Sequence, residues 1–121
     1  MKFSTTRRLT REELRSVEAR IRETNNSLSE HQFLAQVRQI ATWTGWMIYH
    51  THNSLHSPAG FPDLVLCRAP RLIFVELKSD RGKVRTEQTF WLDELGGISS
   101  VETYVWRPSD LDEIGRILAR A

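Results

Sequence analysis

Two short apolar runs, residues 64–67 and 72–77, constrain the fold more than any other part of the chain. The turn Ala69-Pro70-Arg71 connects them, and so short a connection fits an antiparallel hairpin and not a parallel pair of strands. We therefore predict one strand over residues 63–68 and a second strand over residues 72–78.

Three charged side chains lie at the ends of these two predicted strands. Glu76 and Lys78 are two residues apart, so they project from the same face of the second strand. Asp63 begins the first strand and can bring a second carboxylate to the same place. Such charges are costly to bury unless they are paired, solvated or bound, and two carboxylates are the oxygen ligands that a divalent cation needs. The alternative interpretations are a turn aspartate and a surface ion pair.

The N-terminal part of the chain is predicted to contain two helices. Capping boxes begin at Thr10 and at Ser29, and the first of them predicts an amphipathic helix over residues 11–24. The second predicts a well-buried helix. We interpret residues 1–27 as a basic arm with an accessory helix, and residues 28–121 as the single folded domain.

The remaining signals complete an α/β fold. Residues 46–50 and 101–106 are predicted strands, residues 87–95 a predicted helix, and Ser109 is predicted to cap a closing helix. The third and fourth strands are joined through a helix, so we expect them to be parallel in a mixed four-stranded sheet with helices on both faces.

The composition is typical of one soluble domain. Of the 121 residues, 40% are hydrophobic and 26% are charged. We find no apolar run of about 20 residues and no signal-peptide pattern, so we expect no membrane association and a cytoplasmic location. Cys67 is the only cysteine, which excludes an internal disulfide and a cysteine-rich zinc site.

Charge is distributed unevenly along the chain. Residues 68–85 carry six basic and two acidic side chains, whereas residues 86–121 carry three basic and seven acidic ones. The basic stretch flanks Glu76 and Lys78, where it can attract phosphate groups. The alternative is an ordinary solvated surface.

The motifs and their order resemble those of the PD-(D/E)XK nuclease superfamily, and within it the VRR-NUC (virus-type replication-repair nuclease) family. The resemblance extends over about residues 28–106. Its motifs are Gly60-Phe61-Pro62-Asp63-Leu64, then Val75-Glu76-Leu77-Lys78, then Thr86-Glu87-Gln88. It implies a restriction-endonuclease-like αβββαβα core and a Mg²⁺- or Mn²⁺-dependent phosphodiester hydrolase, here an endodeoxyribonuclease.

The resemblance also implies a set of metal ligands. Asp63 and Glu76 would supply carboxylate oxygens, and Leu77 would supply its backbone carbonyl. Glu30 matches an acidic residue that the family carries on its first helix. Its alternative role is to interact favourably with the helix dipole, as acidic residues in a first turn do.

The same resemblance assigns roles in catalysis and DNA binding. Lys78 would orient or deprotonate the attacking water and stabilise the transition state. Gln88 would hydrogen-bond the carboxylates or the substrate phosphate, unless it is an ordinary exposed glutamine. DNA contacts are expected from a loop asparagine and from the basic residues that follow Lys78, namely Asn53, Arg81, Lys83 and Arg85.

Two other groups of side chains receive weaker interpretations. His50, His52 and His56 lie close together in the sequence, but without a cysteine or nearby carboxylate they are a poor zinc site, and we favour contact with substrate. Arg68 and Arg71 lie at the far end of the hairpin, where we expect them to contribute solubility.

The expected substrate is branched DNA. Stand-alone members of the family resemble Holliday-junction resolvases of phages and bacteria, which implies a role in DNA recombination or repair and a homodimer. The thin apolar stripe of Leu14, Val17 and Ile21 is our candidate for part of the dimer interface. Two alternatives remain open: a non-catalytic nucleic-acid-binding protein of the same fold, and a flap or end nuclease acting with a helicase or replication partner.

Overall fold

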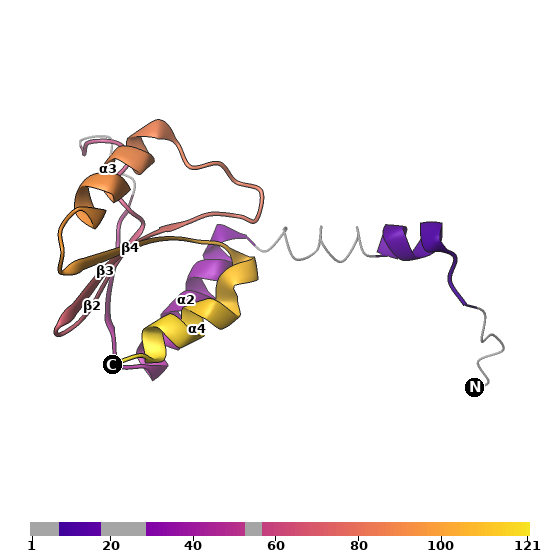
Figure 1. The fold of residues 1–121 in the computed structure, drawn as a ribbon, viewed down its shortest axis with the longest axis horizontal. Helices are drawn as coiled ribbons and strands as arrows, with labels where there is room; N and C mark the ends of the chain where they lie inside the picture. Colours follow the sequence, from indigo (N-terminus) through magenta and orange to yellow (C-terminus); the bar gives the residue numbers. More distant parts are fainter. Residues whose placement is uncertain (1–7, 18–28, 53–56) are drawn as a thin grey trace.

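The computed structural model describes residues 8–17, 29–52 and 57–121 (Figure 1). A helix is present over residues 11–17, within the helix predicted for residues 11–24. The elements that follow are α2 (Glu30–Trp43), β1 (Met47–His50), β2 (Leu64–Arg68), β3 (Arg71–Leu77), α3 (Thr86–Gly96), β4 (Val101–Trp106), a 3₁₀ turn (Pro108–Asp110) and α4 (Leu111–Ala119).

The four strands form one mixed sheet in the order β1-β2-β3-β4. The pairs β1/β2 and β2/β3 are antiparallel, whereas β3 and β4 are parallel and are connected through α3. The predicted hairpin, the crossover and the α/β fold class are therefore confirmed.

The main core lies on one face of the sheet. Leu64, Leu66, Ile73 and Val75 are fully buried there, and side chains of α2 and α4 cover them. Helix α3 packs on the opposite face, over β3 and β4 (Figure 1). The sheet thus has helices on both sides, although among the described residues α3 is the one helix on the second face. None of the helices in the described ranges combines the length and apolarity needed to cross a bilayer.

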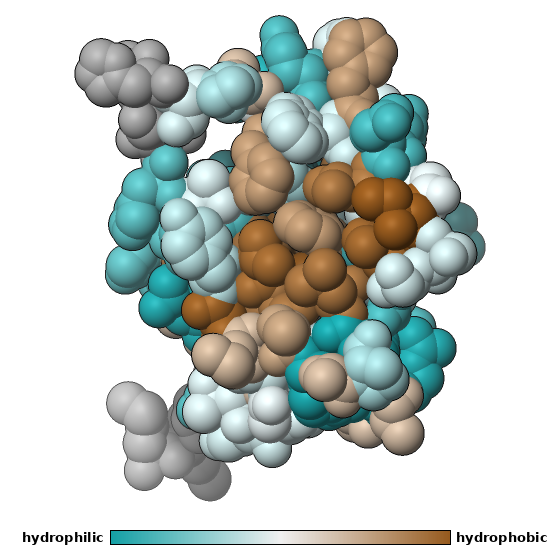
Figure 2. Space-filling model, turned by 90° about the vertical axis from the view of Figure 1, so that its left-hand side faces the viewer, coloured by the Kyte–Doolittle hydropathy of each residue, from teal (hydrophilic) through white to brown (hydrophobic). Residues whose placement is uncertain are grey.

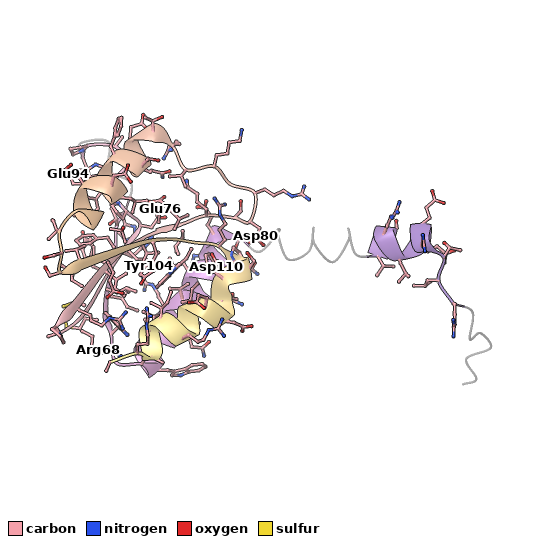
Figure 3. All side chains as sticks on the ribbon, in the orientation of Figure 1. Arg68, Glu76, Asp80, Glu94, Tyr104 and Asp110 are labelled. Atoms are coloured by element: carbon pink, nitrogen blue, oxygen red, sulfur yellow. The ribbon has the colours of Figure 1, made fainter. Side chains whose placement is uncertain are left out.

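Arg68 and Arg71 have a structural role that the sequence analysis did not predict. Their guanidinium groups lie 4.5 and 4.9 Å from the ring centre of Trp46. Arg68 also donates to the carbonyl of Leu118, and Arg71 to that of Ile117, each at 2.9 Å. Both arginines therefore bind carbonyls in the last turn of α4, where the helix dipole favours positive charge (Figure 3 labels Arg68).

The prediction that Ser109 caps the closing helix is wrong. Pro108–Asp110 forms a 3₁₀ turn and α4 begins at Leu111. The backbone N–H of Ser109 donates to Asp80 Oδ1 at 3.0 Å, so the turn is attached to the loop after β3. A proline at the start of a tight turn allows this geometry because its fixed φ already suits it.

Candidate active site

The sheet register places Asp63 and Glu76 side by side. Leu64 pairs with Val75, and one step further along the antiparallel ladder Asp63 falls opposite Glu76. The backbone N–H of Leu77 donates to Asp63 Oδ2 at 2.8 Å. This hydrogen bond fixes the aspartate at the end of β3, so the structure brings the two predicted carboxylates together.

Glu76 is almost completely buried beneath α3, with 2% of its surface exposed (Figure 3). Its Oε1 atom accepts a hydrogen bond of 2.7 Å from Gln88 Nε2 and lies 3.7 Å from Lys78 Nζ. Its Oε2 atom is buried and has no hydrogen-bond partner among the described residues. A buried carboxylate oxygen in this state is costly in a folded protein, and a bound cation would satisfy it.

Electrostatics at the site favour a neutral Glu76 in the absence of a cation. Burial is the main cause that raises the pKa of Glu76, to about 8, and the nearby negative charge of Asp63 acts in the same direction. The positive charge of Lys78 opposes the shift without cancelling it. Two carboxylates in this environment repel each other, and a divalent cation would relieve that repulsion.

The raised pKa predicts how the metal-free protein responds to pH. Folded Glu76 holds its proton up to about pH 8, whereas the unfolded chain releases it near its ordinary value of 4.5. Stability from this group is therefore fully present below about pH 4.5 and is lost as the pH rises through 8. We expect Glu76→Gln to raise the melting temperature in EDTA at pH 8 by at least about 4 °C.

Melting curves recorded by circular dichroism between pH 5 and 9 would check this prediction. Glu94→Gln is the matched control, because Glu94 is an exposed glutamate on α3. A Glu76→Gln protein that melts like wild type at pH 8 would show that Glu76 is not destabilising there.

Gln88 connects the buried carboxylate to the loop before α3. It is 5% exposed, which excludes the interpretation of an ordinary surface glutamine. While its Nε2 donates to Glu76, its Oε1 accepts from the backbone N–H of Arg85 at 2.9 Å. Both ends of the amide are therefore occupied, and Gln88 orients the Glu76 carboxylate.

Gly60 allows the loop that carries Asp63 to pack against α3. Its φ angle is +95°, and a Cβ atom there would lie 2.6 Å from the backbone carbonyl of Glu87. Only glycine avoids this clash and adopts the left-handed conformation without strain. This close approach of the α3 backbone is the physical reason for the glycine in the predicted motif.

The basic loop after β3 is held in place by a residue that the sequence analysis missed. Arg107 Nη1 donates to the carbonyls of Ser79 and Gly82, both at 2.6 Å. The backbone N–H of Lys78 donates to the Trp106 carbonyl at 2.9 Å. The three cationic side chains predicted to bind DNA are exposed on this anchored loop: Arg81, Lys83 and Arg85.

The structure says less about the metal and DNA roles of the other predicted site residues. Glu30 is exposed in the first turn of α2. Across residues 8–17, 29–52 and 57–121, no three His, Cys, Asp or Glu side chains group as metal ligands, so Glu30 does not complete a triad with Asp63 and Glu76. Asn53 and His56 lie outside the described residues.

His50 lies near Asp63 and contacts a second histidine. The rings of His50 and His52 meet edge to face with their centres 4.9 Å apart. Burial lowers the pKa of His50, the neighbouring His52 and Arg38 add to this effect, and Asp63 opposes it. His50 is thus close enough to Asp63 for their charges to interact.

The family assignment follows from a comparison with protein families. Residues 5–106 match the VRR-NUC domain, and the match includes Asp63, Glu76 and Lys78. The chain belongs to the VRR-NUC family. The match begins within the predicted N-terminal arm and ends at the last residue of β4. Searches of curated proteins and of solved structures found no match. The VRR-NUC domain is a nuclease domain, and this chain accordingly carries a nuclease-type fold and function.

Proposed function

We propose that the protein is a divalent-metal-dependent, structure-selective DNA endonuclease that acts on branched DNA in the manner of a Holliday-junction resolvase. The observation that carries the proposal is the buried Oε2 of Glu76, which has no hydrogen-bond partner among the described residues, beside the fixed carboxylate of Asp63. A binding protein without catalytic function has no need to maintain such a costly arrangement.

Asp63 and Glu76 fit Mg²⁺ or Mn²⁺ because both supply hard oxygen ligands. Leu77, through its backbone carbonyl, is a proposed further ligand. Within the described part of the chain, Glu30 does not group with the two carboxylates, and it is proposed to reach the cation through a water molecule. When bound, such a cation supplies charge stabilisation for the phosphate and lowers the pKa of a coordinated water. The chain itself orients the Glu76 carboxylate through Gln88 and holds Asp63 through the Leu77 N–H.

Lys78 is the proposed catalytic cation. Its Nζ atom is 3.7 Å from Glu76 Oε1, so it lies at the edge of the carboxylate pair where a scissile phosphate would be placed. There the ammonium group would hold or accept a proton of the attacking water and stabilise the negative charge that develops on phosphate oxygens.

Contacts to the DNA backbone are proposed for the anchored basic loop and for Asn53. Arg81, Lys83 and Arg85 are exposed and begin three residues after Lys78, a position suited to phosphates that flank the cleavage point. Such contacts carry little base-sequence information, which supports recognition of DNA shape.

We further propose that the protein acts as a homodimer, with the interface on the sheet. The face opposite the core carries two cross-strand rows of side chains, of which α3 covers only the part near β4. The rows are Met47, Cys67, Leu72 and Val101, and Tyr49, Val65, Phe74 and Thr103. Figure 2 shows the apolar patch on this side of the molecule, where Met47 is 76% exposed. Such an exposed apolar patch suits contact with a second copy. The predicted stripe of Leu14, Val17 and Ile21 stays a further candidate for the interface, and Ile21 lies outside the described residues.

Metal dependence is the first test of this function. We expect cleavage of four-way-junction or flap DNA in Mg²⁺ or Mn²⁺, complete loss in EDTA, and no productive replacement by Zn²⁺. The assay compares junction, flap, duplex and single-stranded DNA with RNA of the same sequences. Undiminished cleavage in EDTA contradicts the metal assignment, and binding without cleavage in any metal favours a non-catalytic protein or one that needs a helicase partner.

A further inference from the structure

A cavity of about 660 Å³ opens next to the carboxylate pair. Its volume lies within the range of about 300–1,000 Å³ that is usual for small-molecule sites. Three aromatic side chains line it, each from a different element: Tyr49 from β1, Phe61 from the loop before β2, and Trp91 from α3. The cavity is therefore a composite of the elements that also build the active site.

Ring contacts hold two of the aromatic side chains in place, so that they can bind a planar ligand. The ring of Phe61 meets Trp91 edge to face at a centre distance of 5.1 Å and meets Phe74 in the same way at 6.0 Å. These contacts fix two of the rings before any ligand arrives. Tyr49 is 64% exposed and leaves its ring accessible from the solvent. Rings arranged in this way offer apolar surfaces for stacking.

The cavity is connected to the catalytic carboxylates on two sides. On one side, Phe61 precedes Asp63 by two residues, and Thr51, another lining residue, donates its backbone N–H to the Asp63 carbonyl at 2.8 Å. On the other side, the backbone N–H of Arg85 binds Gln88, which binds Glu76. A ligand in this cavity is consequently adjacent to the position where a phosphodiester would be cleaved.

The chemistry of the lining selects the kind of ligand. Arg85 and His52 add polar and cationic groups to the aromatic walls. A flat aromatic ring attached to a phosphate matches both features, and a nucleotide is such a ligand. The bases of an intact duplex have both faces stacked and cannot enter, whereas an unpaired base can stack on protein side chains.

We propose that this cavity binds the base of an unpaired nucleotide next to the scissile phosphate. The proposal deepens the proposed nuclease function and rests on it. The enzyme then selects DNA in which at least one nucleotide beside the cleavage point is unpaired, as at a fork, a flap or the opened centre of a four-way junction. Selection is for an unpaired base and not for a particular base, because every base has a face that can stack.

The test uses forked duplexes with a single 2-aminopurine placed at successive positions in the single-stranded arm. Binding is measured by fluorescence in EDTA, with wild-type protein, Tyr49→Ala and Phe90→Ala. Phe90 is the matched control, since it is an exposed aromatic residue on α3 that neither lines the cavity nor belongs to the proposed dimer face. Tyr49 does belong to that face, so a substrate with an abasic site separates base binding from dimerisation.

At one position we expect wild-type protein to quench the 2-aminopurine. There, Tyr49→Ala should lower affinity about five- to 150-fold, the range for one stacked base, with Phe90→Ala unchanged. An abasic site at that position should remove the difference between wild type and Tyr49→Ala. Equal affinities of wild type and Tyr49→Ala, or an equal loss in Phe90→Ala, would overturn the proposal.

The cleavage assay distinguishes a failure of the base-binding proposal from a failure of the proposed nuclease function. Wild-type protein that cleaves no substrate in Mg²⁺ or Mn²⁺, while Tyr49-dependent base binding persists, contradicts the nuclease assignment and supports the base site. Metal-dependent cleavage that is insensitive to both Tyr49→Ala and the abasic site supports the nuclease and overturns the base site.

Discussion

Replacing Lys78 with methionine is expected to lower the rate of DNA cleavage at least about 100-fold, because it removes a charge that stabilises the transition state. Methionine retains most of the apolar stem of lysine, so the fold should be preserved. The Nζ atom lies 3.7 Å from Glu76 Oε1 and is not itself a ligand for a cation. The protein should therefore still bind DNA and Mg²⁺, and the substitution should lower the catalytic rate constant.

Single-turnover cleavage with saturating enzyme measures this effect directly, and Lys83→Met provides the control. Lys83 is an exposed lysine in the basic loop, so its loss should weaken DNA binding modestly without affecting single-turnover cleavage at saturation. A Lys78→Met protein that cleaves at the wild-type rate would remove Lys78 from the mechanism. Equal losses in both variants would indicate a general effect of positive charge.

The sequence predicted the strands and the carboxylate pair well because both depend on local rules. Alternation along residues 72–78 placed Glu76 on the face of the strand that points away from the core. The short turn fixed the hairpin, whose register aligns Glu76 with Asp63. The role of Gln88 was predicted as one of two possibilities, since a helix position alone does not say whether the side chain is buried.

Interactions between distant segments were not predictable in the same way. Arg107 holds the loop of residues 79–85, and Arg68 binds the end of α4 some 50 residues later in the chain. Neither contact has a sequence signature, because each depends on how the helices pack on the sheet. The same limit applies to the apolar face: only the position of α3 on the sheet shows that apolar side chains of β1 and β2 remain exposed.

Loss of either carboxylate should remove cleavage together with metal affinity. We expect Asp63→Asn and Glu76→Gln to reduce cleavage at least about 100-fold and to weaken Mg²⁺ binding by about tenfold or more, since even indirect partners of a metal ligand have effects of this size. Calorimetric titration with Mg²⁺ or Mn²⁺ measures the affinity, and Asp93→Asn, which alters an exposed aspartate on α3, is the control.

The two variants should differ from each other in one informative respect. Asp63→Asn removes the negative charge that helps to raise the pKa of Glu76, so that pKa should fall toward the value set by burial and by Lys78. The stability of metal-free Asp63→Asn should then stop declining at a lower pH than that of wild type, so that less stability is lost in total as the pH rises. Glu76→Gln should show no such decline, because the titrating group is gone. Unchanged Mg²⁺ affinity in both variants would contradict a cation bound between these carboxylates, and Lys78 would then remain the only charged catalytic candidate of the three.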